Sequence, residues 1–166
     1  MPPGRRLRPP APTSVLETDV PAAVQRGLAL LARRPRTAAD LRDRLGDRFE
    51  PATVDAALSR LTELGYVDDT AWAAAYVART RSSERSARML RAELREHGVA
   101  PETADEALHA HDDDEAAITA ARRLARGRAP GERARRLHGA LSRRGFGFDV
   151  IERALSRLAE EHASAA

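Results

Sequence analysis

The feature that most constrains the fold of this sequence is one leucine pattern that occurs three times. Each copy has two leucines four residues apart, then a turn, then an Ala-Leu pair. The copies begin at Leu41, Leu90 and Leu137, so the pattern returns after 49 and then 47 residues. Helical arrays whose units stack on one another have periods of this length. Such an array usually offers a long surface to a large partner rather than a pocket to a small substrate.

Helical spacing runs through each copy. In the first, Val54, Leu58, Leu61 and Leu64 recur at intervals of three and four, and no segment alternates long enough to predict a strand. We therefore predict an all-α protein with three tandem three-helix, helix-turn-helix-like repeats in an elongated, curved array. The expected divisions are a disordered Pro- and Arg-rich tail at residues 1–21, units at residues 22–67, 68–111 and 112–160, and a C-terminal tail at residues 161–166.

Two glycines stand at equivalent positions, where the second helix of a unit should end. Gly98 and Gly145 each follow their leucine pair by four residues. A left-handed helix stop is the physical reason for a glycine there. The first unit is one residue shorter at this point and has no equivalent glycine, so we expect its corner to differ.

Composition excludes several classes of function. The sequence has no cysteine, which removes disulfides and thiolate chemistry. It has no apolar run near the roughly 20 residues of a membrane span, and no signal segment follows the basic N-terminus, so we expect a cytoplasmic protein. The acids at residues 112–115 could bind a metal, but they stand at a predicted helix start, which acids stabilise. We expect no catalysis, no cofactor and no metal.

The basic residues suggest a different activity. All 28 are arginines, which bind carboxylates and phosphates through two parallel hydrogen bonds. Residues 99–117 hold seven acids and no arginine, whereas residues 118–157 hold eleven arginines and three acids. The last third of the chain is therefore expected to contact nucleic acid or an acidic protein face.

Several arginines fall on one side of their predicted helices. Arg88, Arg91 and Arg95 lie about 100° or more from the face of Leu90 and Leu94. Intrahelical Glu–Arg pairs on a solvated face would explain a single arginine, but in the third unit, which also carries Arg135, only Glu132 is near enough along the chain to pair. The expected partner contacts are Arg81, Arg85, Arg88, Arg91, Arg95, Arg122, Arg123, Arg126, Arg133, Arg136, Arg143 and Arg144.

Two features would also suit direct binding of nucleic acid. Trp72 and Tyr76 share a helix face, which usually means a core position, although bases could stack there. The first unit resembles a helix-turn-helix followed by the start of a wing at residues 65–67, as in winged-helix transcription regulators. The helix expected at residues 52–64, however, is poor in side chains that read base edges, and residues 22–69 hold eight arginines against eight acids.

Three short motifs follow one another along the chain, and they consist of Gly65, Tyr66, Asp68, Asp69, Trp72, Tyr76, Leu90, Leu94, Gly98, Gly145 and Phe146. The order and spacing of these motifs resemble the RecX family of bacterial regulatory proteins over roughly residues 22–160. In this chain Trp72 stands where the family usually has phenylalanine, His97 where lysine is common, and Ser83 where glycine is frequent.

The resemblance implies a partner and a mode of action. RecX proteins bind the RecA recombinase in the groove of its filament on single-stranded DNA. They typically inhibit its ATPase, strand-exchange and co-protease activities, and so act in recombination, DNA repair and the SOS response. For this chain the resemblance implies binding to the RecA filament and contact with single-stranded DNA, directly or through the filament. We also expect a monomer with no membrane partner.

Overall fold

The computed structural model describes residues 16–79, 84–126 and 133–164, and these residues form nine α-helices in three successive groups of three. The helices of the first group are α1 (Val20–Leu31), α2 (Ala38–Gly46) and α3 (Pro51–Glu63). The second group contains α4 (Asp69–Val77), α5 (Ala87–Glu96) and α6 (Pro101–Ala107). The third contains α7 (Asp113–Ala125), α8 (Arg133–Ser142) and α9 (Phe148–Ser164).

Each group packs around a hydrophobic core of its own. The leucine pairs supply the centre of every core, and all the leucines of these pairs are buried. Phe49 and Leu61 complete the first core, whereas Ile118 and Ile151 complete the third. The second core is smaller and is closed by the partly buried Trp72. Each unit therefore buries its own apolar face, and the prediction of three tandem helical units is confirmed.

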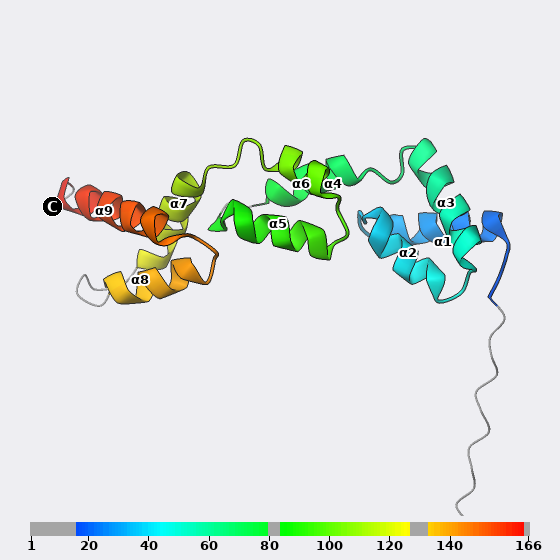
Figure 1. The fold of residues 1–166 in the computed structure, drawn as a ribbon, viewed down its shortest axis with the longest axis horizontal. Helices are drawn as coiled ribbons and strands as arrows, with labels where there is room; N and C mark the ends of the chain where they lie inside the picture. Colours follow the sequence, from blue (N-terminus) through cyan, green and yellow to red (C-terminus); the bar gives the residue numbers. More distant parts are fainter. Residues whose placement is uncertain (1–15, 80–83, 127–132, 165–166) are drawn as a thin grey trace, which may run out of the picture.

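The three units follow one another in an extended row, as Figure 1 shows. The middle helices α8, α5 and α2 follow one another along the same side of that row. The first turns of α2 and α5 each lie at the end of the next unit's middle helix, as the hydrogen bonds between units show. The repeat is thus preserved in the packing of the units as well as in their sequence.

Both ends of the helical array extend beyond the divisions expected from the sequence. The side chain of Asp19 accepts a hydrogen bond from the N–H of Ala22 at 3.0 Å, and this cap starts α1 at Val20 rather than at residue 22. Glu17 then exchanges backbone hydrogen bonds with the corner after α2, as donor to the carbonyl of Arg48 and as acceptor from Glu50. At the other end α9 continues to residue 164. The rest of the expected N-terminal tail lies outside the described residues.

The predicted glycine corners are confirmed. Gly98 and Gly145 have φ of 74° and 88°, in the left-handed region. In both corners the residue after the glycine donates its N–H to the carbonyl of the second leucine of the pair, from Val99 at 3.0 Å and from Phe146 at 3.4 Å. In the first unit no left-handed residue follows α2, and Phe49 reaches its leucine by a shorter loop. That corner differs, as expected.

The wing considered for the first unit is not formed. Gly65 has φ of 74° and ends α3, and the N–H of Tyr66 bonds back to the carbonyl of Leu61 at 2.9 Å. Val67 is buried in the first core, and α4 begins two residues later. No strand exists in the described part of the chain, where the sole β-bridge joins Glu17 to Phe49. A winged-helix regulator is therefore not favoured.

Candidate functional site

The candidate site lies where the second unit meets the third. The N–H of Ser86, the N-cap of α5, donates to the carbonyl of Arg144 at the end of α8, at 3.0 Å. The N–H of Ala87 donates to Oδ1 of Asp113, the first residue of α7, at 2.7 Å. These bonds place the first turn of α5 beside the end of α8 and the start of α7.

Three adjoining clefts follow this junction and share the side chain of Arg143. We call them together the arginine groove. Its apolar floor includes Met89 and Leu124. The arginines that line it are Arg85, Arg88, Arg91, Arg95, Arg123, Arg126, Arg135, Arg136, Arg143 and Arg144. The groove therefore combines arginines of both units on one surface.

Four arginines of the groove have no acidic partner among the described residues: Arg95, Arg126, Arg135 and Arg143. All four are exposed. Among the described residues, two further guanidinium groups bond to backbone carbonyls alone, Arg88 to Gly145 at 3.4 Å and Arg144 to Ala140 at 3.0 Å. A carbonyl orients a guanidinium without cancelling its charge. These side chains therefore remain able to bind carboxylates or phosphates of a partner.

Other arginines of the groove are held by acids of their own chain. Arg85 pairs with Glu93, which also accepts a hydrogen bond from the hydroxyl of Tyr76 at 2.8 Å. The bond to Glu93 raises the pKa of Arg85, while burial and the same carboxylate raise the pKa of Tyr76. Arg123 pairs at 2.7 Å with Glu84, whose side chain is only 8% exposed. These pairs offset part of the positive charge in the cleft that Glu84 and Glu93 help to line.

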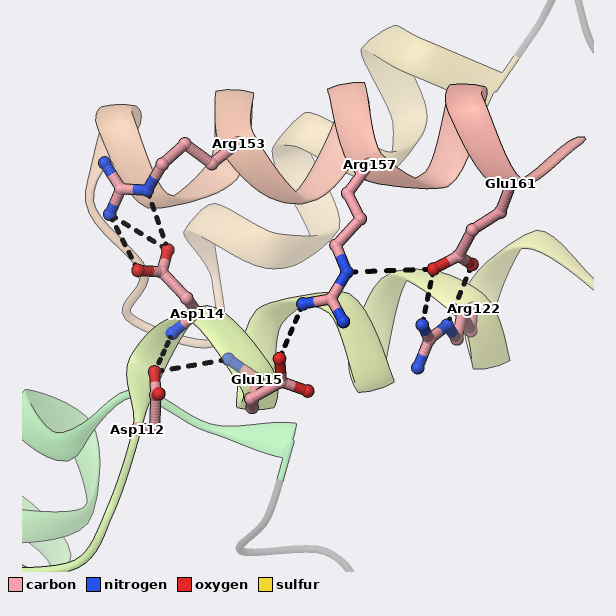
Figure 2. Close-up of polar contacts among 7 residues, drawn as sticks. All are labelled: Asp112, Asp114, Glu115, Arg122, Arg153, Arg157 and Glu161. Atoms are coloured by element: carbon pink, nitrogen blue, oxygen red, sulfur yellow. Dashed lines mark hydrogen bonds and ion pairs between the residues drawn. The ribbon is translucent and has the colours of Figure 1, made fainter. Parts of the chain in front are cut away.

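A contrasting arrangement covers the contact between α7 and α9, and Figure 2 shows it. Guanidinium groups reach carboxylates on the facing helix, Arg153 to Asp114 at 2.9 Å and Arg122 to Glu161 at 2.5 Å. The hydrogen bond from Arg122 lowers the pKa of Glu161. Arg157 bridges Glu115 and Glu161, at 2.5 and 3.8 Å. We call these six residues the α7–α9 ion-pair lattice.

The lattice corrects one expectation. The arginines of the third unit were expected to have few acids to pair with, because only Glu132 lies nearby along the chain. The packing of α7 on α9 instead supplies acids from 39 residues away, as in the bond from Arg122 to Glu161. Arg122 thus belongs to the lattice and not to the arginine groove. Glu132 itself lies outside the described residues.

The groove gathers most of the contacts expected from the sequence. Arg81 lies outside the described residues, and Arg133 begins α8 with a side chain that is not described. Arg135 was left out of the expected contacts, although its neighbour Arg136 was included. The floor residues Met89 and Leu124 were missed too, because a lone apolar residue beside an arginine gives no sequence signal of its own.

The aromatic pair is part of the second unit's packing. Trp72 and Tyr76 stack with ring centroids 5.2 Å apart and pack on the second core. The ring of His97 lies 4.9 Å from that of Trp72. The pair therefore closes the small second core, as the core interpretation predicted.

The acids at residues 112–115 cap α7 or bond to other side chains and backbone groups, and they do not gather into a metal-binding group. Asp112 caps α7, accepting from the N–H of Asp114 at 2.8 Å and of Glu115 at 3.3 Å. Within the described ranges, His, Asp and Glu side chains form no group of three that could hold a metal ion. The same residues include no helix long and apolar enough to cross a membrane.

Family models match each unit in turn. They are described as the first, second and third three-helix domains of RecX, and they match residues 23–61, 68–108 and 112–155. The matches follow the order of the three units in the structure, and together they cover most of the chain.

Relatives that are similar over most of their length are also named as RecX proteins. "Regulatory protein RecX" of Thermobifida fusca is 40% identical over 134 residues, covering 76% of this chain and 72% of the relative. That of Stenotrophomonas maltophilia is 34% identical over 159 residues, covering 93% and 92%. The crystal structure of RecX from Lactobacillus salivarius superposes with a TM-score of 0.69 at 20% identity, covering 84% of this chain and 96% of that one. The chain belongs to the RecX family of regulatory proteins.

Proposed function

We propose that this protein binds the RecA filament on single-stranded DNA and inhibits its ATPase, strand-exchange and co-protease activities, acting in the cytoplasm as a monomer. The observation that carries the proposal is the arginine groove, within a chain that belongs to the RecX family. In this proposal the protein acts by binding the filament and catalyses no reaction.

The form of the groove suits a long, acidic or phosphate-bearing partner. It spans two units, and it places exposed arginines on both sides of the junction, such as Arg95 on α5 and Arg135 on α8. A small ligand would need convergent polar groups around an enclosed pocket. Separate charges along an extended surface instead favour attraction to another extended, negatively charged surface. A nucleoprotein filament presents such a surface, either through DNA phosphates or through acidic side chains.

The test is a titration of the purified protein into RecA that has been assembled on single-stranded DNA. We expect the rate of ATP hydrolysis to fall as the protein is added, and the protein to co-sediment with the filament. The same amounts of protein should leave an unrelated ATPase unaffected, which controls for nonspecific effects of a basic protein. A constant hydrolysis rate over a wide concentration range, without co-sedimentation, would overturn the proposal.

A second measurement separates the two ways of reaching the filament. Binding to free single-stranded DNA is measured at several salt concentrations. If the groove contacts phosphates directly, the affinity falls steeply as salt is raised, because each neutralised phosphate releases a counterion. If the groove contacts only acidic protein side chains, free DNA does not bind while the filament still does.

A further inference from the structure

The two junctions between units are built in the same way. At the second junction the N–H of Ser86 donates to the carbonyl of Arg144 at 3.0 Å. At the first junction the hydroxyl of Thr37 donates to the carbonyl of His97 at 2.8 Å. Thr37 and Ser86 are the N-caps of α2 and α5, and each carbonyl belongs to the residue before a left-handed glycine. The start of one middle helix is therefore bonded to the end of the next unit's middle helix.

A carboxylate from the next unit completes each junction. The N–H of Ala38 donates to Oδ1 of Asp69 at 2.9 Å, and the N–H of Ala87 donates to Oδ1 of Asp113 at 2.7 Å. Both acids are the first residue of the helix that opens the next unit. The first N–H groups of a helix have no acceptor within that helix. Here the following unit supplies the acceptor, so the start of α2 and of α5 depends on the unit that follows.

Close approach explains why glycine stands at these junctions. A Cβ at Gly98 would lie 2.2 Å from the Cβ of Ala39, and a Cβ at Gly145 would lie 2.4 Å from Oγ of Ser86. Gly65 has the same left-handed backbone as Gly98 but would meet nothing within 4 Å. The backbone angle alone would thus favour glycine at all three positions. Contact between units is an additional requirement at only two of them.

These contacts set how neighbouring units lie, because each unit keeps a separate core in the described residues. We propose that Ser86, Asp113 and Gly145 are positioning residues that align α5 with α8 and thereby hold the arginines of two units in one groove. Thr37, Asp69 and Gly98 align the first unit with the second in the same way. The alignment stands on the geometry alone, while its effect on binding rests on the proposed function.

The alignment can be measured without any partner. Because the chain has no cysteine, cysteines introduced by Glu102→Cys on α6 and Glu160→Cys on α9 carry two spin labels at known, exposed positions. We expect a narrow distribution of label distances in the parent protein. Gly145→Ala should broaden and shift that distribution, since the added methyl group cannot fit against Ser86.

Matched variants separate positioning from backbone strain. Gly65→Ala imposes the same left-handed strain in open space, so it should leave the distance between α6 and α9 unchanged. Asp113→Asn keeps an oxygen acceptor for the N–H of Ala87 and should preserve the distance, whereas Asp113→Ala should broaden it. An unchanged distance in Gly145→Ala, or an equal broadening in Gly65→Ala, would overturn the proposal. Circular dichroism and melting of every variant check that the helices remain folded.

The effect on function is measured separately. If both units grip one partner, losing their alignment removes the gain from simultaneous contact, so Gly145→Ala should weaken binding to the RecA filament by about tenfold or more. Asp113→Asn should bind like the parent protein. Broadened distances with unchanged filament binding would show that alignment does not serve this groove. Failure of the parent protein to bind the filament would refute the proposed function and leave the distance result standing.

Discussion

Two arginine-rich surfaces lie in the second half of this protein, and they differ in what surrounds each guanidinium. In the α7–α9 ion-pair lattice every arginine contacts a carboxylate on the facing helix. In the arginine groove Arg95, Arg126, Arg135 and Arg143 contact no acid in the described residues. The same residue type therefore joins two helices in one place and leaves positive charge exposed in the other.

A high density of arginines therefore does not by itself mark a binding surface. An ion pair on the surface is largely satisfied and adds little attraction for a distant partner. Unpaired guanidinium groups keep both their charge and their hydrogen-bond donors. We therefore expect the two surfaces to respond oppositely when their charges are changed, one in partner binding and the other in stability.

The largest expected effect is on binding. Reversing three unpaired charges with Arg95→Glu, Arg135→Glu and Arg143→Glu should weaken filament binding by about 100-fold or more, because repulsion replaces attraction on both sides of the junction. The melting temperature should change little, since these side chains have no acidic partner to lose among the described residues. Co-sedimentation with RecA on single-stranded DNA measures the first quantity, and circular dichroism measures the second.

A control of equal charge reverses three exposed arginines of the first unit, Arg26, Arg33 and Arg34, which lie outside the groove. Of these, Arg34 has a carboxylate nearby, that of Asp40 at 3.9 Å, so the melting temperature of this control is measured as well. The change in net charge is identical. If both triple variants lose binding equally, total charge rather than the groove attracts the partner, and the comparison between the two surfaces fails.

The sequence predicted more of the fold than of the contrast between the two arginine-rich surfaces. Helix periodicity and glycine stops are local signals, so the three units and the corners at Gly98 and Gly145 could be predicted. The lattice could not be, since Arg122 and Glu161 are 39 residues apart and meet only after α7 packs on α9. The same reason hid the role of Asp113. As the first residue of a helix it looked like part of a cap, whereas its side chain bonds the previous unit.

A smaller effect is expected in the lattice, and it concerns stability. Replacing Arg122, Arg153 and Arg157 by glutamine removes the contacts between α7 and α9 and should lower the melting temperature by about 2–4 °C. Filament binding should stay within about twofold of the parent protein, because these arginines do not line the groove. The corresponding glutamine triple at Arg95, Arg135 and Arg143 removes the same charge. It should weaken filament binding and leave the melting temperature nearly unchanged. Equal losses of stability in both triple variants would contradict the assignment of stability to the lattice and of binding to the groove.

The smallest expected effect depends on pH and concerns Glu161. Its pKa is lowered in the folded protein, first by the hydrogen bond from Arg122. A carboxyl that binds its proton more weakly when folded stabilises the protein fully above the ordinary glutamate pKa of 4.5, and this contribution is lost as the pH falls through the lower folded value. Melting curves from about pH 6 to about pH 3 should therefore show a steeper loss of stability in the parent protein than in Glu161→Gln, by about 1–2 °C. Arg122→Gln should likewise make the loss of melting temperature at low pH less steep, because the hydrogen bond that lowers the pKa of Glu161 is gone. Parallel curves for all three proteins would mean that the lattice pairs are too well solvated to couple protonation to folding, and the contrast with the groove would then rest on binding alone.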